Sequence, residues 1–174
     1  TDTARPQGCT NFKLHQLGRV VARHYDEYLA AAGMRGTQYS LLSQIVVNGP
    51  LRAGELAQRM HLDNSTLTRT LTTLERQGWI TRHSGADGRS RLIAATVDGA
   101  ARRREAQRCW KRAQQALNAR LGEAEVVRLH ALLDTLTEAL DQPVDDRLGG
   151  APANVACGLA RLGASVGFAG RLGQ

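Results

Sequence analysis

Hydroxyl and guanidinium side chains gather on one side of a predicted helix near the middle of the chain. At about 100° per residue, Leu67, Leu71 and Leu74 share one face. The remaining surface carries the polar set Ser65, Thr66, Thr68, Arg69, Thr72 and Arg76. Short hydroxyls approach base edges and phosphates closely, and arginine forms paired hydrogen bonds with guanine, so this chemistry suits a DNA major groove. The alternative is an ordinary solvated face, but such faces are usually rich in Glu and Lys.

A second short amphipathic helix is predicted just before this one, over residues 52–60. A tight connection at His61 and Leu62 separates the two, and Asp63 is placed to cap the second helix. The small side chain of Ala57 allows the helices to pack closely. Two helices in this arrangement predict a helix-turn-helix, whose second helix enters the major groove.

A basic β-hairpin is predicted directly after these helices. Residues 79–84 and 89–96 are β-rich, and residues 85–88 supply the turn. The tip carries Asp87, Arg89 and Arg91. Arginine at such a tip can enter the electronegative minor groove, and a nearby carboxylate can hold its guanidinium. The hairpin is therefore a candidate DNA-binding wing, with a solvated loop as the alternative.

Four further helices are expected, over residues 11–32, 37–47, 98–120 and 123–140. Asp98 is placed to cap the third of these. The last carries an apolar stripe of Leu129, Leu132, Leu133, Leu136 and Leu140. Such a stripe indicates a core or a partner helix.

The hairpin also carries a family signature: Asp, any residue, Arg, five residues, Leu-Thr, two residues, Gly. Asp87, Arg89, Thr96 and Gly99 fall in register, with Ala95 in place of the Leu. With the segment at residues 37–42, the chain resembles the MarR family of dimeric winged-helix transcription regulators over about residues 1–142. The resemblance implies a mainly α fold with a small β-hairpin wing.

By the same resemblance, a winged helix-turn-helix occupies about residues 37–97, and dimerisation helices occupy about 11–33 and 98–141. The implied protein is a homodimeric repressor with a role in stress response and no enzymatic activity. Two recognition helices about one DNA turn apart would bind a palindromic operator in double-stranded DNA.

Composition is compatible with this expectation. The chain has 174 residues, a net charge of +7 and a pI near 10.1, with 21 Arg and 2 Lys. A polyanionic partner is implied, although the Arg bias also suits a GC-rich genome. No apolar run approaches the roughly 18 residues of a membrane span, so we expect a cytoplasmic protein. The three cysteines have no paired spacing, and the histidines are scattered, so neither a metal site nor a cofactor is expected.

The signal that releases DNA is expected, by resemblance, to be a small aromatic or phenolic ligand or an oxidant such as peroxide. Cys9 precedes the first helix as the peroxide-sensing cysteine does in some family members, and Cys109 is a candidate partner. The alternative is an incidental exposed thiol and a buried one. A ligand pocket is a second possibility, with aromatic lining from His24, Tyr25, Tyr28, Tyr39 and Trp110, most of which would otherwise belong to the core.

Two segments leave their role open. Six basic residues, Arg102, Arg103, Arg104, Arg108, Lys111 and Arg112, would contact flanking phosphates or form a solvated face. After a linker at residues 143–148, residues 149–174 resemble the sugar-binding signature of ribokinase-like carbohydrate kinases. The alternative function is therefore a truncated carbohydrate kinase fused to a regulatory winged helix, but no catalytic motif follows the fragment.

Overall fold

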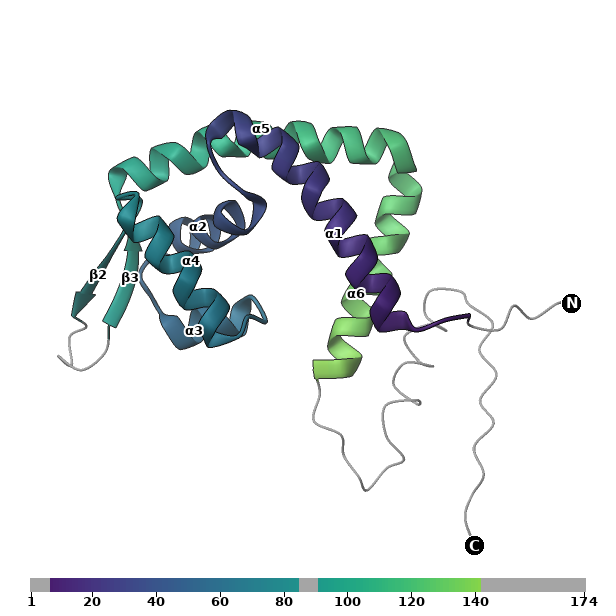
Figure 1. Cartoon of the computed structure of the whole chain (residues 1–174), viewed down its shortest axis with the longest axis horizontal. Coiled ribbons are helices and arrows are strands. Elements are labelled where there is room, and N and C mark those ends of the chain that lie inside the picture. The colour runs from purple at the N-terminus through teal and green to yellow at the C-terminus, as the bar shows by residue number, and fades with distance from the viewer. Residues whose placement is uncertain (1–6, 85–90, 142–174) are drawn as a thin grey trace, which may run out of the picture. The chain divides into compact units, whose positions relative to one another are not determined.

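The computed structural model describes residues 7–84 and 91–141, which form a mainly α-helical fold with a small antiparallel sheet (Figure 1). The elements in chain order are α1 (Thr10–Leu29), the 3-10 helix η1 (Ala30–Ala32), α2 (Gly36–Asn48), β1 (Leu51–Arg52), α3 (Ala53–Arg59), α4 (Asn64–Arg76), β2 (Ile80–Ser84), β3 (Arg91–Ala95), α5 (Val97–Leu121) and α6 (Glu123–Asp141). The predicted fold class is confirmed. The chain divides into two compact units, Thr1–Ala116 and Leu117–Gln174, and the division falls within α5.

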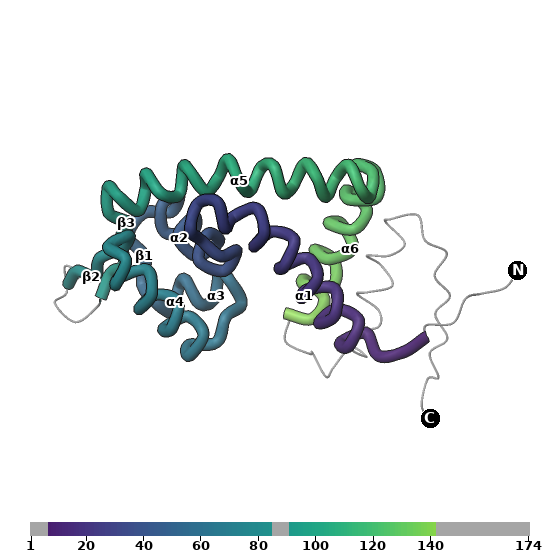
Figure 2. The backbone as a smooth tube through the Cα atoms, turned by 45° about the horizontal axis from the view of Figure 1, so that its top comes forward, coloured from purple at the N-terminus to yellow at the C-terminus, as the bar shows by residue number. Residues whose placement is uncertain are grey.

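The core of the first unit lies where α2, α3 and α4 meet, and Figure 2 shows these helices close together beside β2 and β3. Leucine and isoleucine side chains fill it, each at most 3% exposed: Leu41, Leu42, Ile45, Leu56, Leu67, Leu71 and Leu74. Burial of each such side chain stabilises the fold by about 1.5–3 kcal/mol. The apolar face of α4 is therefore what fixes this helix to the domain.

The sheet has the strand order β1-β3-β2 with antiparallel pairing throughout. Residues Ile80 and Ala95 are paired at one end of the β2–β3 ladder, and Ser84 and Arg91 at the other. The sequence did not predict β1, which has only two residues and pairs Leu51 with Ile93. Both of these side chains are buried, so β1 attaches the hairpin to the helical core.

The N-terminus of α5 differs from the prediction. Thr96, rather than Asp98, caps the helix, because the Thr96 Oγ1 accepts a hydrogen bond from the Gly99 N–H at 2.9 Å. Asp98 lies instead within the first turn. A capping side chain accepts from an N–H group two or three residues after it. Asp98 already lies inside the turn whose N–H groups need such a partner.

The first predicted helix also ends differently. The α-helical part stops at Leu29, and a 3-10 turn over Ala30–Ala32 follows before Gly33 adopts a left-handed conformation with φ of 63°. Such tightening is common in the last turn of a helix. It carries the chain from α1 into α2.

In the second unit, α6 follows Gly122, whose φ is 85°. Of its apolar residues only Val126 is buried, whereas Val127, Leu132, Leu133 and Leu140 are exposed. The predicted leucine stripe is therefore largely open to solvent in this single chain.

Candidate nucleic-acid interface and adjacent cavity

The two faces of α4 are as different as the sequence predicted. Leu67, Leu71 and Leu74 are buried in the core. The predicted DNA-binding residues of this helix are all exposed: Ser65, Thr66, Thr68, Arg69, Thr72 and Arg76. The helix is thus anchored on one side and presents hydroxyl and guanidinium groups on the other.

Asp63 organises the first turn of α4. Its carboxylate accepts hydrogen bonds from the Thr66 N–H at 2.8 Å, the Thr66 hydroxyl at 2.7 Å and the Ser65 hydroxyl at 2.5 Å. The hydroxyl of Ser65, followed by the groups of Thr66, holds the pKa of Asp63 well below its ordinary value. The hydroxyl hydrogens of Ser65 and Thr66 are therefore engaged in capping, which confirms Asp63 as the predicted cap.

The threonine hydroxyls further along α4 donate to the helix backbone. Thr68 donates to the Asn64 carbonyl at 2.7 Å, and Thr72 donates to the Thr68 carbonyl at 2.8 Å. Such hydrogen bonds leave the hydroxyl oxygen as an acceptor and the methyl group as an apolar contact. The exposed threonines consequently offer methyl groups, which can contact the C5-methyl of thymine.

An ion pair that the sequence analysis missed joins α4 to the hairpin. Arg82 of β2 lies with its Nε 3.2 Å from Glu75 Oε2 of α4. Both side chains are partly exposed, so the pair contributes little stability, but it links the predicted recognition helix to the predicted wing. Arg91 begins β3 and is exposed. The predicted tip residues Asp87 and Arg89 lie outside the described residues.

The basic cluster of α5 separates into two kinds of residue. Arg102 lies over the Trp79 ring at 5.7 Å and pairs with Glu105 at 2.9 Å. Arg103 donates to Gln107 at 3.0 Å and to the Ser43 hydroxyl at 3.4 Å. These two arginines are half-buried and contact residues of the same chain. The exposed members are Arg104, Arg108, Lys111 and Arg112, the last of which lies 6.0 Å from the Tyr28 ring centre.

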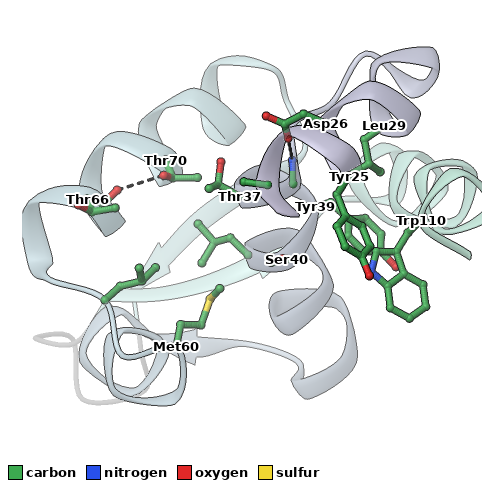
Figure 3. Close-up of a pocket in the computed structure, with 14 residues that line it drawn as sticks. Tyr25, Asp26, Leu29, Thr37, Tyr39, Ser40, Met60, Thr66, Thr70 and Trp110 are labelled. Carbon is green, nitrogen blue, oxygen red and sulfur yellow. Dashed lines mark hydrogen bonds between the residues drawn. The ribbon is translucent and has the colours of Figure 1, made fainter. Parts of the chain in front are cut away.

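A cavity of about 410 Å³ lies beside the first two turns of α4 (Figure 3). Its lining comes from α1, α2, the connection before α4, α4 itself and α5: Ala22, Tyr25, Asp26, Leu29, Gly36, Thr37, Tyr39, Ser40, Leu41, Met60, Leu62, Thr66, Thr70 and Trp110. Trp110 stacks on Tyr39 with ring centres 6.2 Å apart. The volume is within the usual range for small-molecule sites.

The predicted effector residues do not all reach this cavity. Tyr25 and Trp110 line it, as does Tyr39. His24 instead donates from Nε2 to the Ala113 carbonyl at 2.9 Å, and its ring packs against Tyr28. Polar lining from Asp26, Thr66 and Thr70 was not predicted, because Asp26 belongs to α1 and the two threonines to α4, and no local pattern places these helices together.

The two described cysteines differ in their surroundings. Cys9 is exposed at the residue before α1, whereas Cys109 is half-buried and packs against the core. Among the described residues no group of His, Cys, Asp and Glu could hold a metal ion. Likewise, no helix in the described ranges is long and apolar enough to cross a membrane.

Buried helices, an exposed Thr/Arg helix and an attached hairpin define the winged helix-turn-helix class. The model of the MarR family matches residues 36–90, and the chain belongs to this family. It is 34% identical over 90 residues to the organic hydroperoxide resistance transcriptional regulator of Bacillus subtilis, a match covering 51% of this chain and 61% of that protein. The matched regions span only 61% to 63% of the curated relatives' own length.

Solved structures extend the likeness over more of the chain. The transcriptional regulator MosR of M. tuberculosis in complex with DNA is 30% identical, with a TM-score of 0.66, covering 78% of this chain and 100% of that one. A MarR variant from E. coli complexed with operator DNA is 26% identical, with a TM-score of 0.67, covering 72% of this chain and 91% of that one. These relatives are transcriptional regulators rather than enzymes.

Proposed function

We propose that this chain is a dimeric, sequence-specific DNA-binding transcriptional regulator that represses transcription until a small aromatic ligand or an oxidant releases it. The observation that carries the proposal is the exposed hydroxyl and arginine face of α4, held in place by three buried leucines. The related MosR and MarR structures contain DNA, which supports the same role here. No catalytic role is assigned, and DNA as partner implies a cytoplasmic location.

DNA contact is assigned to the residues named from the sequence. Arg69 and Arg76 would bind guanine or phosphate, and Thr68 and Thr72 would contact base edges in the major groove. Arg91, with Asp87 and Arg89 outside the described residues, would contact the adjacent minor groove. Ser65 and Thr66 would act through the N-terminal turn of α4, where backbone N–H groups and the helix dipole favour a phosphate.

A second copy of this chain is the proposed dimer partner. Helix α1 exposes Phe12, Leu14, Leu17 and Val20, and α6 separately exposes Val127, Leu132, Leu133 and Leu140. Apolar side chains in such number are costly to leave in water and are typical of an interface. A two-fold dimer would present two α4 helices to a palindromic operator.

Selection from a random duplex library tests this function. The purified full chain should enrich a palindrome whose half-sites are centred about one helical turn apart, roughly 34–36 Å. Recovery of unrelated sequences with no two-fold symmetry would contradict a sequence-specific dimer.

Two signals are proposed for release. The cavity beside α4 would take a small aromatic ligand, because three aromatic rings and several hydroxyls line it. Oxidation of exposed Cys9 is the second candidate, favoured by the likeness to the hydroperoxide resistance regulator. If peroxide treatment leaves DNA binding unchanged, the proposal that oxidation of Cys9 releases DNA is wrong. The alternative of a truncated sugar kinase rests on residues 149–174, which lie outside the described residues.

A further inference from the structure

The cavity beside α4 differs in charge from the rest of this basic protein. The chain carries a net charge of +7, yet none of the described lining residues is Lys, Arg or His. Asp26 supplies the one charged side chain among them. An anionic ligand would therefore enter a site with a carboxylate and without a described counter-ion.

Asp26 belongs to α1 and lines one side of the cavity, where its side chain reaches the start of α2 (Figure 3). Its Oδ1 accepts a hydrogen bond from the Gly36 N–H at 2.6 Å. An ionised carboxylate has about four lone-pair positions, so this hydrogen bond leaves capacity for a further donor. The Gly36 contact also holds the side chain in one orientation.

Aromatic surface lies near this carboxylate. Tyr25 is the residue before Asp26 in α1. Tyr39 stacks with Trp110. The Tyr25 hydroxyl donates to Gln114, and burial raises its pKa above the ordinary value. A protonated phenol and stacked rings favour an aromatic ligand, and ring faces attract a cation.

Removing an anion from water is unfavourable unless an opposite charge meets it, and Asp26 would add repulsion. A primary ammonium group instead finds a carboxylate acceptor and electron-rich rings. We propose that this cavity binds a primary arylalkylamine, with its ammonium group on Asp26 and its ring among Tyr25, Tyr39 and Trp110, and that it discriminates against aromatic carboxylates. Binding of the ligand does not depend on the proposed function; only its effect on DNA binding rests on that function.

That consequence follows from the position of α4. Thr66 and Thr70 line the cavity, and Thr66 also belongs to the hydrogen-bonded cap around Asp63. A ligand seated against these residues contacts the turn from which the proposed DNA-binding face begins. Occupancy would therefore shift α4 and weaken DNA binding.

Three probes with one ring system test the ligand class: 2-naphthylmethylamine, 2-naphthalenemethanol and 2-naphthoate, which are cationic, neutral and anionic at pH 7. Calorimetric titration into the full chain should show the amine binding at least about tenfold more tightly than the alcohol, a difference of about 1.4 kcal/mol. The carboxylate should bind most weakly. Equal or tighter binding of 2-naphthoate would overturn the proposal.

The variant Asp26→Asn removes the charge and keeps an oxygen that can accept from Gly36. It should lower the affinity for the amine far more than the affinity for the alcohol, and so remove the preference for the amine. Glu27→Gln is the matched control, because Glu27 is the next residue of α1, is exposed and does not line the cavity. An amine preference that survives in Asp26→Asn would contradict the role assigned to this carboxylate. An equal loss of the preference in Asp26→Asn and Glu27→Gln would show that the overall charge of the protein, and not Asp26, causes it.

A folding defect is distinguished by binding of the alcohol, which Asp26→Asn should retain. Calorimetry needs no DNA, so the ligand assignment is tested separately from the proposed function. Fluorescence anisotropy of labelled DNA with added amine then tests release. Absence of any DNA binding would contradict the proposed function while leaving the calorimetric result intact.

Discussion

The backbone of Trp79 lies directly against Gly99, with no room for a side chain between them. A Cβ on Gly99 would overlap the Trp79 carbonyl oxygen and would lie 2.8 Å from its carbonyl carbon. Thr96 completes the contact, because its N–H donates to the same carbonyl oxygen at 3.0 Å. This joint connects the start of β2 to the start of α5, and it explains why the hairpin signature ends in a glycine.

Replacement of Gly99 by alanine should destabilise the protein by about 1–3 kcal/mol, since a rigid backbone group would have to move. Chemical denaturation would measure the change. Gly54→Ala is the control, because Gly54 lies in α3 with open space around its Cα. Alanine there should be neutral or stabilising by up to about 1 kcal/mol. A Gly99→Ala protein as stable as the wild type would show that the backbone at Trp79 and Gly99 moves apart at little energetic cost.

The Thr96 hydroxyl is the second part of this joint. It donates to the Gly78 carbonyl at 2.7 Å and accepts from the Gly99 N–H at 2.9 Å. Thr96→Val keeps the shape but leaves both backbone groups without this partner, so we expect a loss of about 1–3 kcal/mol in unfolding free energy. Thr96→Ser retains the hydroxyl and should lose less. A loss in Thr96→Ser with none in Thr96→Val would assign the effect to the methyl group instead.

The cap at Asp63 should make stability depend on pH. Because the folded-state pKa of Asp63 is lowered, its contribution is present above the unfolded value near 4 and is lost as the pH falls toward the folded value. The melting temperature of Asp63→Asn should therefore lie below that of the wild type at pH 7, with the gap closing below about pH 4. Glu27→Gln provides a control for removal of a carboxylate. A gap that stays constant down to pH 2 would contradict a charge effect.

The exposed threonines of α4 predict a dependence on thymine methyl groups. Replacing thymine by deoxyuridine in the selected operator removes each C5-methyl and should weaken binding about fourfold per contacted methyl, since a buried methyl is worth about 0.8 kcal/mol. Thr72→Ser removes the protein's methyl and keeps the hydroxyl. Competition binding should show a smaller thymine-to-uracil ratio for this variant at one base position. An unchanged ratio would exclude Thr72 from methyl contact.

Local patterns predicted the helices well. The buried leucines of α4 and the Asp63 cap follow from helical periodicity and from a cap within three residues of its donors. The cap of α5 was predicted wrongly because Thr96 and Asp98 are both good caps two residues apart. In the structure the Thr96 hydroxyl also donates to the Gly78 carbonyl, a contact between residues 18 positions apart that no local pattern gives.

The cavity could not be predicted in full because it depends on tertiary packing. Aromatic residues suggested Tyr25 and Trp110, but the same criterion also selected His24 and Tyr28, whose side chains pack elsewhere. Asp26 has no sequence feature that marks it as lining a cavity. Its role depends on α2 beginning at Gly36, ten residues further along the chain.

The central claim is that the exposed face of α4 distinguishes DNA sequences, and Arg69 tests it most directly. Fluorescence anisotropy at several salt concentrations would compare wild type, Arg69→Ala and Arg19→Ala, an exposed arginine of α1, on the selected operator and on random DNA. We predict that Arg69→Ala loses about 1–3 kcal/mol on the operator and much less on random DNA, while Arg19→Ala changes neither appreciably. Equal loss for Arg69→Ala on both duplexes would contradict base recognition by α4.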